Sequence, residues 1–303
     1  MDLNEVIKEY VETRYLRKAS DADLSERLTY LGANLWSTDK DGSVTQPRSL
    51  ENRLVIIRLY VHTLYEQSCR TDFDIQFDEA AIRTEASASY VRPNLKLPIE
   101  FDPICFAKFG KSEHLVPMLE QGVIRIAPAA SYADSSLNSA QMDEELKHLV
   151  RSPNERLMMN MYGTDSDGNK VEIVPEYGEL FRYMMVPNFF VWCCGLGYDA
   201  RLFHEFQADT CLVIHDQGAF TSRLNKAVQE QHSGTKFHHG PIMYYDPYTS
   251  KREQLKWGYS KHLRYLYQNE HRFIWNVNAT ELQPFFVQLG PLHDIANLVE
   301  LTN

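Results

Sequence analysis

The spacing of apolar residues changes once along this chain, between residues 87 and 103. Before that stretch, apolar residues recur every three or four positions, which is the period of a helix with one buried face. Prolines at positions 93, 98 and 103 then interrupt the pattern, and short apolar runs typical of buried strands follow. We therefore predict two domains, an α-helical module over residues 1–95 and an α+β domain over residues 96–303.

Three helices are expected in the first module. An apolar row through residues 6–11 predicts the first helix, and a second row through residues 24–31 predicts another. Ser20 or Asp21 can cap this second helix, because a side-chain oxygen at that position accepts a hydrogen bond from a helix N–H group. Residues 50–69 carry the pattern of a longer helix.

The second part of the chain alternates short strands with short helices. Strands are expected at residues 104–109, 123–127, 189–194, 210–214, 241–245, 270–275 and 285–289. Helices are expected at residues 112–121, with a cap at Ser112, and at residues 199–206 and 221–231, and a hairpin is expected over residues 157–174 around the turn at 165–169. Regular βαβ units are missing from this pattern, which favours an α+β sandwich over a doubly wound parallel sheet.

Composition narrows the possible functions. The formal net charge of -10 argues against an extended nucleic-acid surface, which needs many basic residues to neutralise phosphates. Apolar runs all fall short of the roughly 20 residues of a membrane span, and the N-terminus lacks the pattern of a signal peptide, so we expect a cytoplasmic protein without a membrane partner. The cysteines do not form a disulfide framework, and neither they nor the histidines have the spacing of a metal site, so free thiols and no metal are expected.

Basic and aromatic residues are interleaved over residues 250–272. This mixture suits a local pocket that binds phosphates and stacked rings, even in an acidic protein. The alternative interpretation is a solvated helix followed by a core strand. Both interpretations fit the sequence.

A polar motif lies at the end of that segment, at Gln268-Asn-Glu270. If residues 270–275 continue as a strand, then Gln268, Glu270 and Arg272 share one face, while residues 271, 273 and 275 share the other. One face is then polar and the other aromatic. A glutamate beside an arginine in a strand is commonly a solvated or ion-paired edge, which is the structural alternative to a catalytic role.

Several segments, taken in succession, resemble a known family. They read "FAKFG", "GVIRIAPAASYAD", "FFVWCCG", "LFHEFQADTCLVIHD", "IMYYDP" and "KHLRYLYQNEHRFIW". With the Gln-x-Glu spacing, this order resembles the ADP-ribosyltransferase-like domains of bacterial toxins and phage-defence proteins. The resemblance covers the second predicted domain and implies a two-sheet α+β fold that binds NAD as a substrate.

The resemblance implies two catalytic residues. Glu270 would stabilise the positive charge that develops on the ribose when nicotinamide leaves, as carboxylates do in glycoside hydrolysis. Gln268 would orient the acceptor. The alternatives are NAD hydrolysis with water as acceptor, and a non-catalytic sensor or binding module that keeps the fold.

The resemblance also implies residues that bind NAD. Lys108 lies on the first strand, where the family has Arg or His, and this departure favours the non-catalytic alternative. Ser131 and Tyr132 lie where the family has a residue beside the nicotinamide ring, and Arg272 is expected to contribute to the same site. Without the resemblance, Tyr132 is a tyrosine in a surface turn.

Relatives of this kind imply a toxin or an anti-phage effector. The acceptor is expected to be a macromolecule, either RNA or protein. A toxin needs a neutralising antitoxin protein, and the helical module is a candidate surface for its docking.

Overall fold

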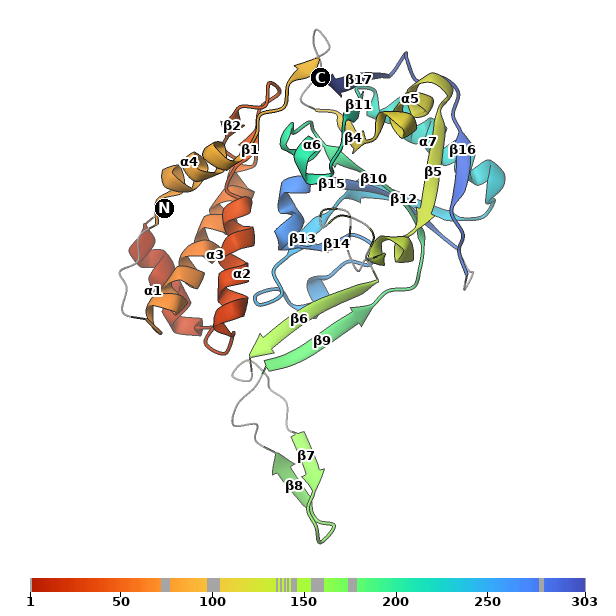
Figure 1. The fold of residues 1–303 in the computed structure, drawn as a ribbon. Helices are drawn as coiled ribbons and strands as arrows, with labels where there is room; N and C mark the ends of the chain where they lie inside the picture. The colour runs from red at the N-terminus through yellow and green to blue at the C-terminus, as the bar shows by residue number, and fades with distance from the viewer. Residues whose placement is uncertain are drawn as a thin grey trace.

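The computed structural model describes residues 2–71, 77–96, 104–134, 136, 138, 140, 142, 146–153, 161–173, 179–277 and 281–302. Helices occupy the N-terminal part of the chain, and a large antiparallel sheet occupies most of the remainder (Figure 1). The predicted mixed α+β class is confirmed. None of the described helices is long and apolar enough to cross a membrane.

The N-terminal helices are α1 (Leu3–Thr13), α2 (Asp21–Ala33), α3 (Leu50–Ser68) and α4 (Glu79–Ser89), with a small hairpin of β1 (Ser37–Thr38) and β2 (Val44–Thr45) between α2 and α3. Ser20 caps α2 as predicted. Its hydroxyl accepts a hydrogen bond from the backbone of Asp23, whose carboxylate accepts one from the Ser20 backbone. Helix α4 was not predicted, because its alanine-rich sequence carries little apolar periodicity and only Ala86 is buried.

Nine strands form the large sheet. Along the sheet they are β12 (Lys236–Pro241), β15 (Glu270–Asn276), β10 (Phe190–Leu196), β4 (Phe106–Gly110), β11 (Thr210–Ile214), β17 (Ala296–Leu301) and β3 (Leu95–Lys96), while β5 (Val123–Pro128) pairs with β10 and with β16 (Phe285–Gln288). All of these pairings are antiparallel. The strands predicted at the centre of the sheet are confirmed, whereas β12 and β17 were missed.

The sheet splits at β10. One end of β10 is in register with β5, at Phe190 and Val191, and the other end is in register with β4, at Gly195 and Leu196. Residues 192–194 pair with β15 but are in register with neither β4 nor β5. Two strands thus diverge from a common neighbour.

Helices cover both faces of this sheet. Helix α5 (Ser112–Gln121) and helix α7 (Gln217–Gln231) contribute to the core that contains Trp192 and Phe273, and α6 (Arg201–Glu205) contributes to the core on the other face. The predicted cap at Ser112 is wrong. Lys111 precedes α5, and the backbone N–H of Ser112 donates instead to the carboxylate of Asp209, which is distant in sequence.

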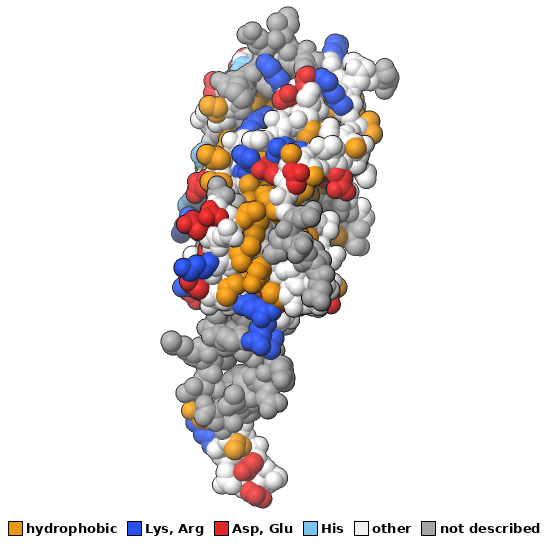
Figure 2. Space-filling view, turned by 90° about the vertical axis from the view of Figure 1, so that its left-hand side faces the viewer, with side chains coloured by type: hydrophobic (Ala, Val, Ile, Leu, Met, Phe, Trp, Pro, Cys, Tyr) orange, Lys and Arg blue, Asp and Glu red, His pale blue; other side chains and the backbone are white. Residues whose placement is uncertain are grey.

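The N-terminal helices pack directly against the chain that follows β12. Tyr248 and Leu263 belong to the same apolar core as α1, α2 and α3. Arg27 of α2 makes a bidentate ion pair with Asp246, at 2.5 and 2.8 Å, and both side chains are buried. The outer face of these helices shows a strip of apolar side chains between charged ones (Figure 2).

An arm projects from the body of the molecule (Figure 1). It consists of β7 (Met161–Thr164) paired antiparallel with β8 (Lys170–Ile173). The arm extends beyond a second antiparallel pair, β6 (Lys147–Pro153) with β9 (Glu179–Met185), in which Val150 packs against Tyr245 and Leu255 of the body. The predicted turn at residues 165–169 connects β7 and β8. Residues 157–160 and 174 of the predicted hairpin lie outside the described part of the chain.

Candidate functional site

A cavity of about 750 Å³ lies at the split in the sheet. Its wall includes residues 107–110 of β4 and residues 193–195 of β10, the two strands that separate there. Diverging strands leave space between them that side chains only partly fill. The cavity falls within the size range of small-molecule and cofactor sites.

Four of the predicted site residues line this cavity, namely Lys108, Tyr132, Gln268 and Glu270. Two others are not among its lining residues. The Ser131 hydroxyl donates to the carbonyl of Pro128 at 2.7 Å, and Arg272 lies behind Glu270 with 1% of its side chain exposed.

Glu270 opens strand β15 and is held by two cations. The Arg272 guanidinium donates to one carboxylate oxygen, and the Lys261 ammonium donates to the other at 2.7 Å. Burial alone would raise the pKa of Glu270, but the charges and hydrogen bonds of Arg272 and Lys261 outweigh burial and hold this pKa well below its usual value. The carboxylate is therefore ionised throughout the physiological pH range.

The predicted alternation of faces along β15 is confirmed. Glu270 and Arg272 lie on the cavity side, while Phe273 and Trp275 belong to the apolar core on the other side. Glu270 is in register with Gly195 on β10. A Cβ atom at Gly195 would meet two backbone oxygens at 3.3 and 3.4 Å, so the close approach of the chain at this point favours glycine.

Gln268 reaches the cavity from the segment that precedes strand β15. It ends a 3-10 helix, η4 (Leu263–Gln268), and Asn269 then adopts a left-handed conformation with φ 42° before the strand begins. The Gln268 carboxamide accepts from Lys261 at 3.1 Å and donates to the carbonyl of Ala140 at 2.8 Å. Both ends of the carboxamide thus have protein partners.

Lys108 spans the split. Its ammonium group donates to the backbone carbonyl of Cys193 at 2.7 Å and lies 5.2 Å from the centroid of the Trp192 ring. The lysine therefore binds a carbonyl in the part of β10 that is in register with neither diverging strand. This contact is a structural reason for a lysine at position 108 that does not depend on any ligand. The ammonium group also places a positive charge at the cavity wall.

The described lining of the cavity is basic although the protein is acidic. Among its described lining residues, the charged side chains are Lys108, Lys111, Arg125, Lys261 and the single carboxylate of Glu270. The whole chain has a net charge of -10. This local reversal of charge favours an anionic ligand.

Lys261 was not singled out from the sequence. It lies on β14 (Ser260–His262), which pairs in parallel with β13 (Met243–Tyr245) outside the large sheet. No strand or helix period relates it to Glu270, so only its place in the basic and aromatic segment over residues 250–272 hinted at a site. The helix considered for that segment is not present; short 3-10 turns stand there, at η3 (Arg252–Gln254) and η4.

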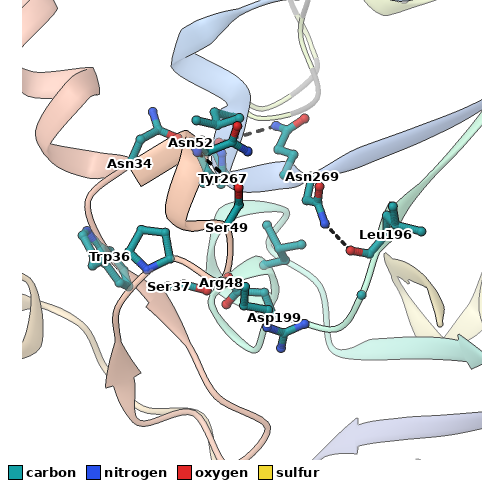
Figure 3. Close-up of a pocket in the computed structure, with 15 residues that line it drawn as sticks. Asn34, Trp36, Ser37, Arg48, Ser49, Asn52, Leu196, Asp199, Tyr267 and Asn269 are labelled. Atoms are coloured by element: carbon teal, nitrogen blue, oxygen red, sulfur yellow. Dashed lines mark hydrogen bonds between the residues drawn. The ribbon is translucent and has the colours of Figure 1, made fainter. Parts of the chain in front are cut away.

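A second, smaller cavity of about 120 Å³ lies between the N-terminal helices and the sheet (Figure 3). Several of its polar side chains are hydrogen-bonded to each other or to the backbone. Asn34 accepts from the backbone of Tyr267 at 2.7 Å, and Asp199 accepts from the Ser37 hydroxyl at 2.6 Å. This smaller cavity lies where the N-terminal helices contact the rest of the fold. Gln268 lines both this cavity and the larger one.

Among the described residues, no group of three or more His, Cys, Asp and Glu side chains is arranged to hold a metal ion. None of the five cysteines, all of which lie in the described part, forms a disulfide. Comparison of the chain with family models, with curated proteins and with solved structures gives no match.

Proposed function

We propose that this protein transfers ADP-ribose from NAD to a macromolecular acceptor, either RNA or protein. One observation carries the proposal: Glu270, Gln268, Lys108 and Tyr132, which were selected from motifs far apart in the sequence, border a single cavity. The basic lining suits the pyrophosphate of a dinucleotide, because lysine and arginine bind phosphate through charge-assisted hydrogen bonds. Tyr132 offers a ring on which the nicotinamide can stack.

The reaction breaks the bond between nicotinamide and the ribose carbon. The bonding electrons leave with nicotinamide, and the ribose acquires oxocarbenium character that an ionised carboxylate stabilises. Glu270 is that carboxylate. The acceptor oxygen or nitrogen then bonds to the same ribose carbon and loses its proton, which completes the transfer.

A non-catalytic binding module is the second candidate, and one observation favours it. Arg272 and Lys261 each donate to one oxygen of Glu270, so cations already engage both oxygens of the carboxylate. Such a group binds anions well but offers less stabilisation to a cation. In this case the cavity would bind a nucleotide without breaking it.

The test uses NAD labelled in its adenine ring, incubated with the purified protein and a bacterial lysate that is then divided into protein and RNA fractions. The expected result is label in one fraction, lost in Glu270→Gln and retained in the exposed control Glu253→Gln. Free ADP-ribose without labelled macromolecule would establish a glycohydrolase instead. Intact NAD that nevertheless binds to the protein would establish the binding module.

The biological role that we propose is that of a toxin or anti-phage effector. Expression of the wild-type chain in bacteria should arrest growth, and Glu270→Gln should not. The exposed apolar side chains of α1 and α3, which include Leu3, Val11, Leu50 and Leu54, are the surface that we propose for a neutralising protein. Normal growth with the wild-type protein present at high level would contradict this role.

A further inference from the structure

Lys261 contacts both of the side chains to which the proposed function assigns catalytic roles. Its ammonium group donates to the Glu270 carboxylate at 2.7 Å and to the Gln268 carboxamide at 3.1 Å. Only 5% of its side chain is exposed, yet it borders the cavity. We propose that Lys261 is the positioning residue of this site, which fixes Glu270 and Gln268 relative to each other at the cavity wall; the proposal rests on the proposed function.

The backbone alone does not hold the two side chains together. Gln268 ends a 3-10 helix and Glu270 begins a strand, and the left-handed Asn269 between them bends the chain from one element to the other. Lys261 comes from a third element, β14, and joins the two across this bend. A bridge from outside the bend restricts both side chains at once.

Lys261 is itself held in place. Its ammonium group lies 4.7 Å from the centroid of the Tyr265 ring, and the Tyr265 hydroxyl donates to the carbonyl of Met142. The Gln268 carboxamide is anchored at its other end by the carbonyl of Ala140. The bridge is therefore part of a preorganised network, as positioning requires.

Arg272 has a different role. It donates to Glu270 and to the carbonyl of Gly258 at 2.9 Å, and it does not border the cavity. In the part of the chain that the structure describes, Arg272 donates to Glu270, whereas Lys261 donates to both Glu270 and Gln268. Arg272 supports the carboxylate from behind, and Lys261 sets its position relative to Gln268.

Charged and titratable groups surround Glu270 on several elements. Two of them are cations, namely Arg272 on the same strand and Lys261 on β14. The other two are the hydroxyl of Tyr244 on β13, which accepts a hydrogen bond from the Glu270 backbone, and the thiol of Cys194 on β10. Burial raises the pKa of both Tyr244 and Cys194, so these two groups are neutral at physiological pH. Two cations therefore keep Glu270 ionised, and removal of Lys261 leaves one in contact.

The first test compares the pH dependence of kcat and KM for NAD in wild type, Lys261→Met and Lys261→Gln, with the exposed Lys251→Met as the matched control. Loss of positioning should lower kcat by about 10- to 100-fold while KM changes by less than about threefold. The acidic limb of the kcat profile should move up by about one pH unit or more, because one of the two cations that favour ionised Glu270 has gone. A loss of folding alone would lower the active fraction and leave the profile in place.

A second measurement does not depend on catalysis. The Glu270 side-chain carboxyl carbon, labelled with carbon-13 and assigned by its absence in Glu270→Gln, should remain ionised in the folded wild type as the pH falls, and should titrate at higher pH in Lys261→Gln. Wild-type protein that leaves NAD intact would overturn the proposed function, while this titration would still decide the role of Lys261. Unchanged titration and an unchanged kcat profile in both variants would overturn the positioning role.

Discussion

Two buried ion clusters differ in what surrounds them. Arg27 and Asp246 join the N-terminal helices to the rest of the chain, with 1% and 4% of their side chains exposed, and neither borders a described cavity. Lys261 and Glu270 are nearly as buried, with 5% and 7% exposed, but both line the large cavity. The burial of a charge pair therefore does not distinguish a structural pair from a functional one.

Geometry separates the two clusters. Asp246 has one cationic partner, in a bidentate arrangement that saturates both charges, and hydroxyl groups of Thr249 and Tyr30 complete the network. Glu270 has two cationic partners, and both Glu270 and Lys261 line the large cavity. A buried bidentate pair away from any described cavity stabilises a fixed contact, whereas a charge cluster that lines a cavity can respond to a ligand.

Asp246→Asn is expected to have the largest effect on stability. It leaves the Arg27 charge buried without its counter-ion, which should lower the free energy of unfolding by about 3–5 kcal/mol. Urea denaturation measures this loss. Molecules that remain folded should consume NAD at the wild-type rate, and a selective loss of turnover would contradict the structural assignment.

Glu270→Gln should have the opposite pattern, with a large loss of NAD turnover and a smaller loss of stability. Turnover of NAD should fall by about 10²- to 10³-fold, which is typical when a group that stabilises the transition state is removed. The stability loss should be smaller than for Asp246→Asn, about 1–3 kcal/mol, because Lys261, one of the two cations that remain, borders the cavity, where solvent can reach it. Unfolding curves and single-turnover rates measured on the same samples test both expectations. Equal stability losses for Glu270→Gln and Asp246→Asn would contradict the distinction between a functional and a structural pair.

Histidines near each cluster predict a pH dependence of stability. His262 packs against Tyr30 beside the Arg27 pair, and burial lowers its pKa to about 3. Burial and the neighbouring His239 lower the pKa of His271 to about 4.

Both histidines have an ordinary pKa of 6.5, so between about pH 6.5 and 4 the unfolded chain binds protons that the folded chain does not. Stability should be fully present above that range and fall with pH at about 1.4 kcal/mol per pH unit for each histidine. His262→Gln and His271→Gln should each reduce the slope by that amount, as unfolding titrations at pH 7, 6 and 5 can measure. A slope that neither substitution changes would show that these side chains are protonated in the folded state.

Lys108→Gln should have the smallest effect. The amide can still donate to the Cys193 carbonyl, so the fold should be kept, while one positive charge leaves the cavity wall. The KM for NAD should rise by about 5- to 30-fold, the equivalent of about 1–2 kcal/mol for a hydrogen bond to a charged group. The exposed Lys226→Gln on α7 is the control, and an equal effect of both substitutions would mean that only overall charge matters.

Much of the secondary structure could be predicted from the sequence. The capping box at Ser20 and the apolar runs of β4, β10, β11 and β15 depend on residues close together in the chain. Strand β12 was missed because Phe237 is its one large apolar side chain and the strand lies at the edge of the sheet. The cap of α5 was wrong because its acceptor, Asp209, comes from another segment.

The candidate site could be predicted in part. Alternation along a strand placed Glu270 and Arg272 on one face, because a strand turns its side chains to opposite sides in strict order. The same rule does not extend to Gln268, since Gln268 ends a 3-10 helix and the left-handed Asn269 separates it from the strand. Lys261 was not predicted as a site residue because it lies on β14, which pairs with β13 outside the large sheet.

The sequence by itself determined the local elements, the mixed α+β class and the polar face that begins at Glu270. The tertiary structure alone decided that β4 and β5 diverge from β10, that a basic cavity opens between them, and that Lys261 bridges the two polar side chains at its wall. Local patterns act through neighbours in the chain, whereas the split and the bridge depend on which distant strands and side chains meet. That choice is made by packing and by the pairing of buried charges, which no short stretch of sequence contains.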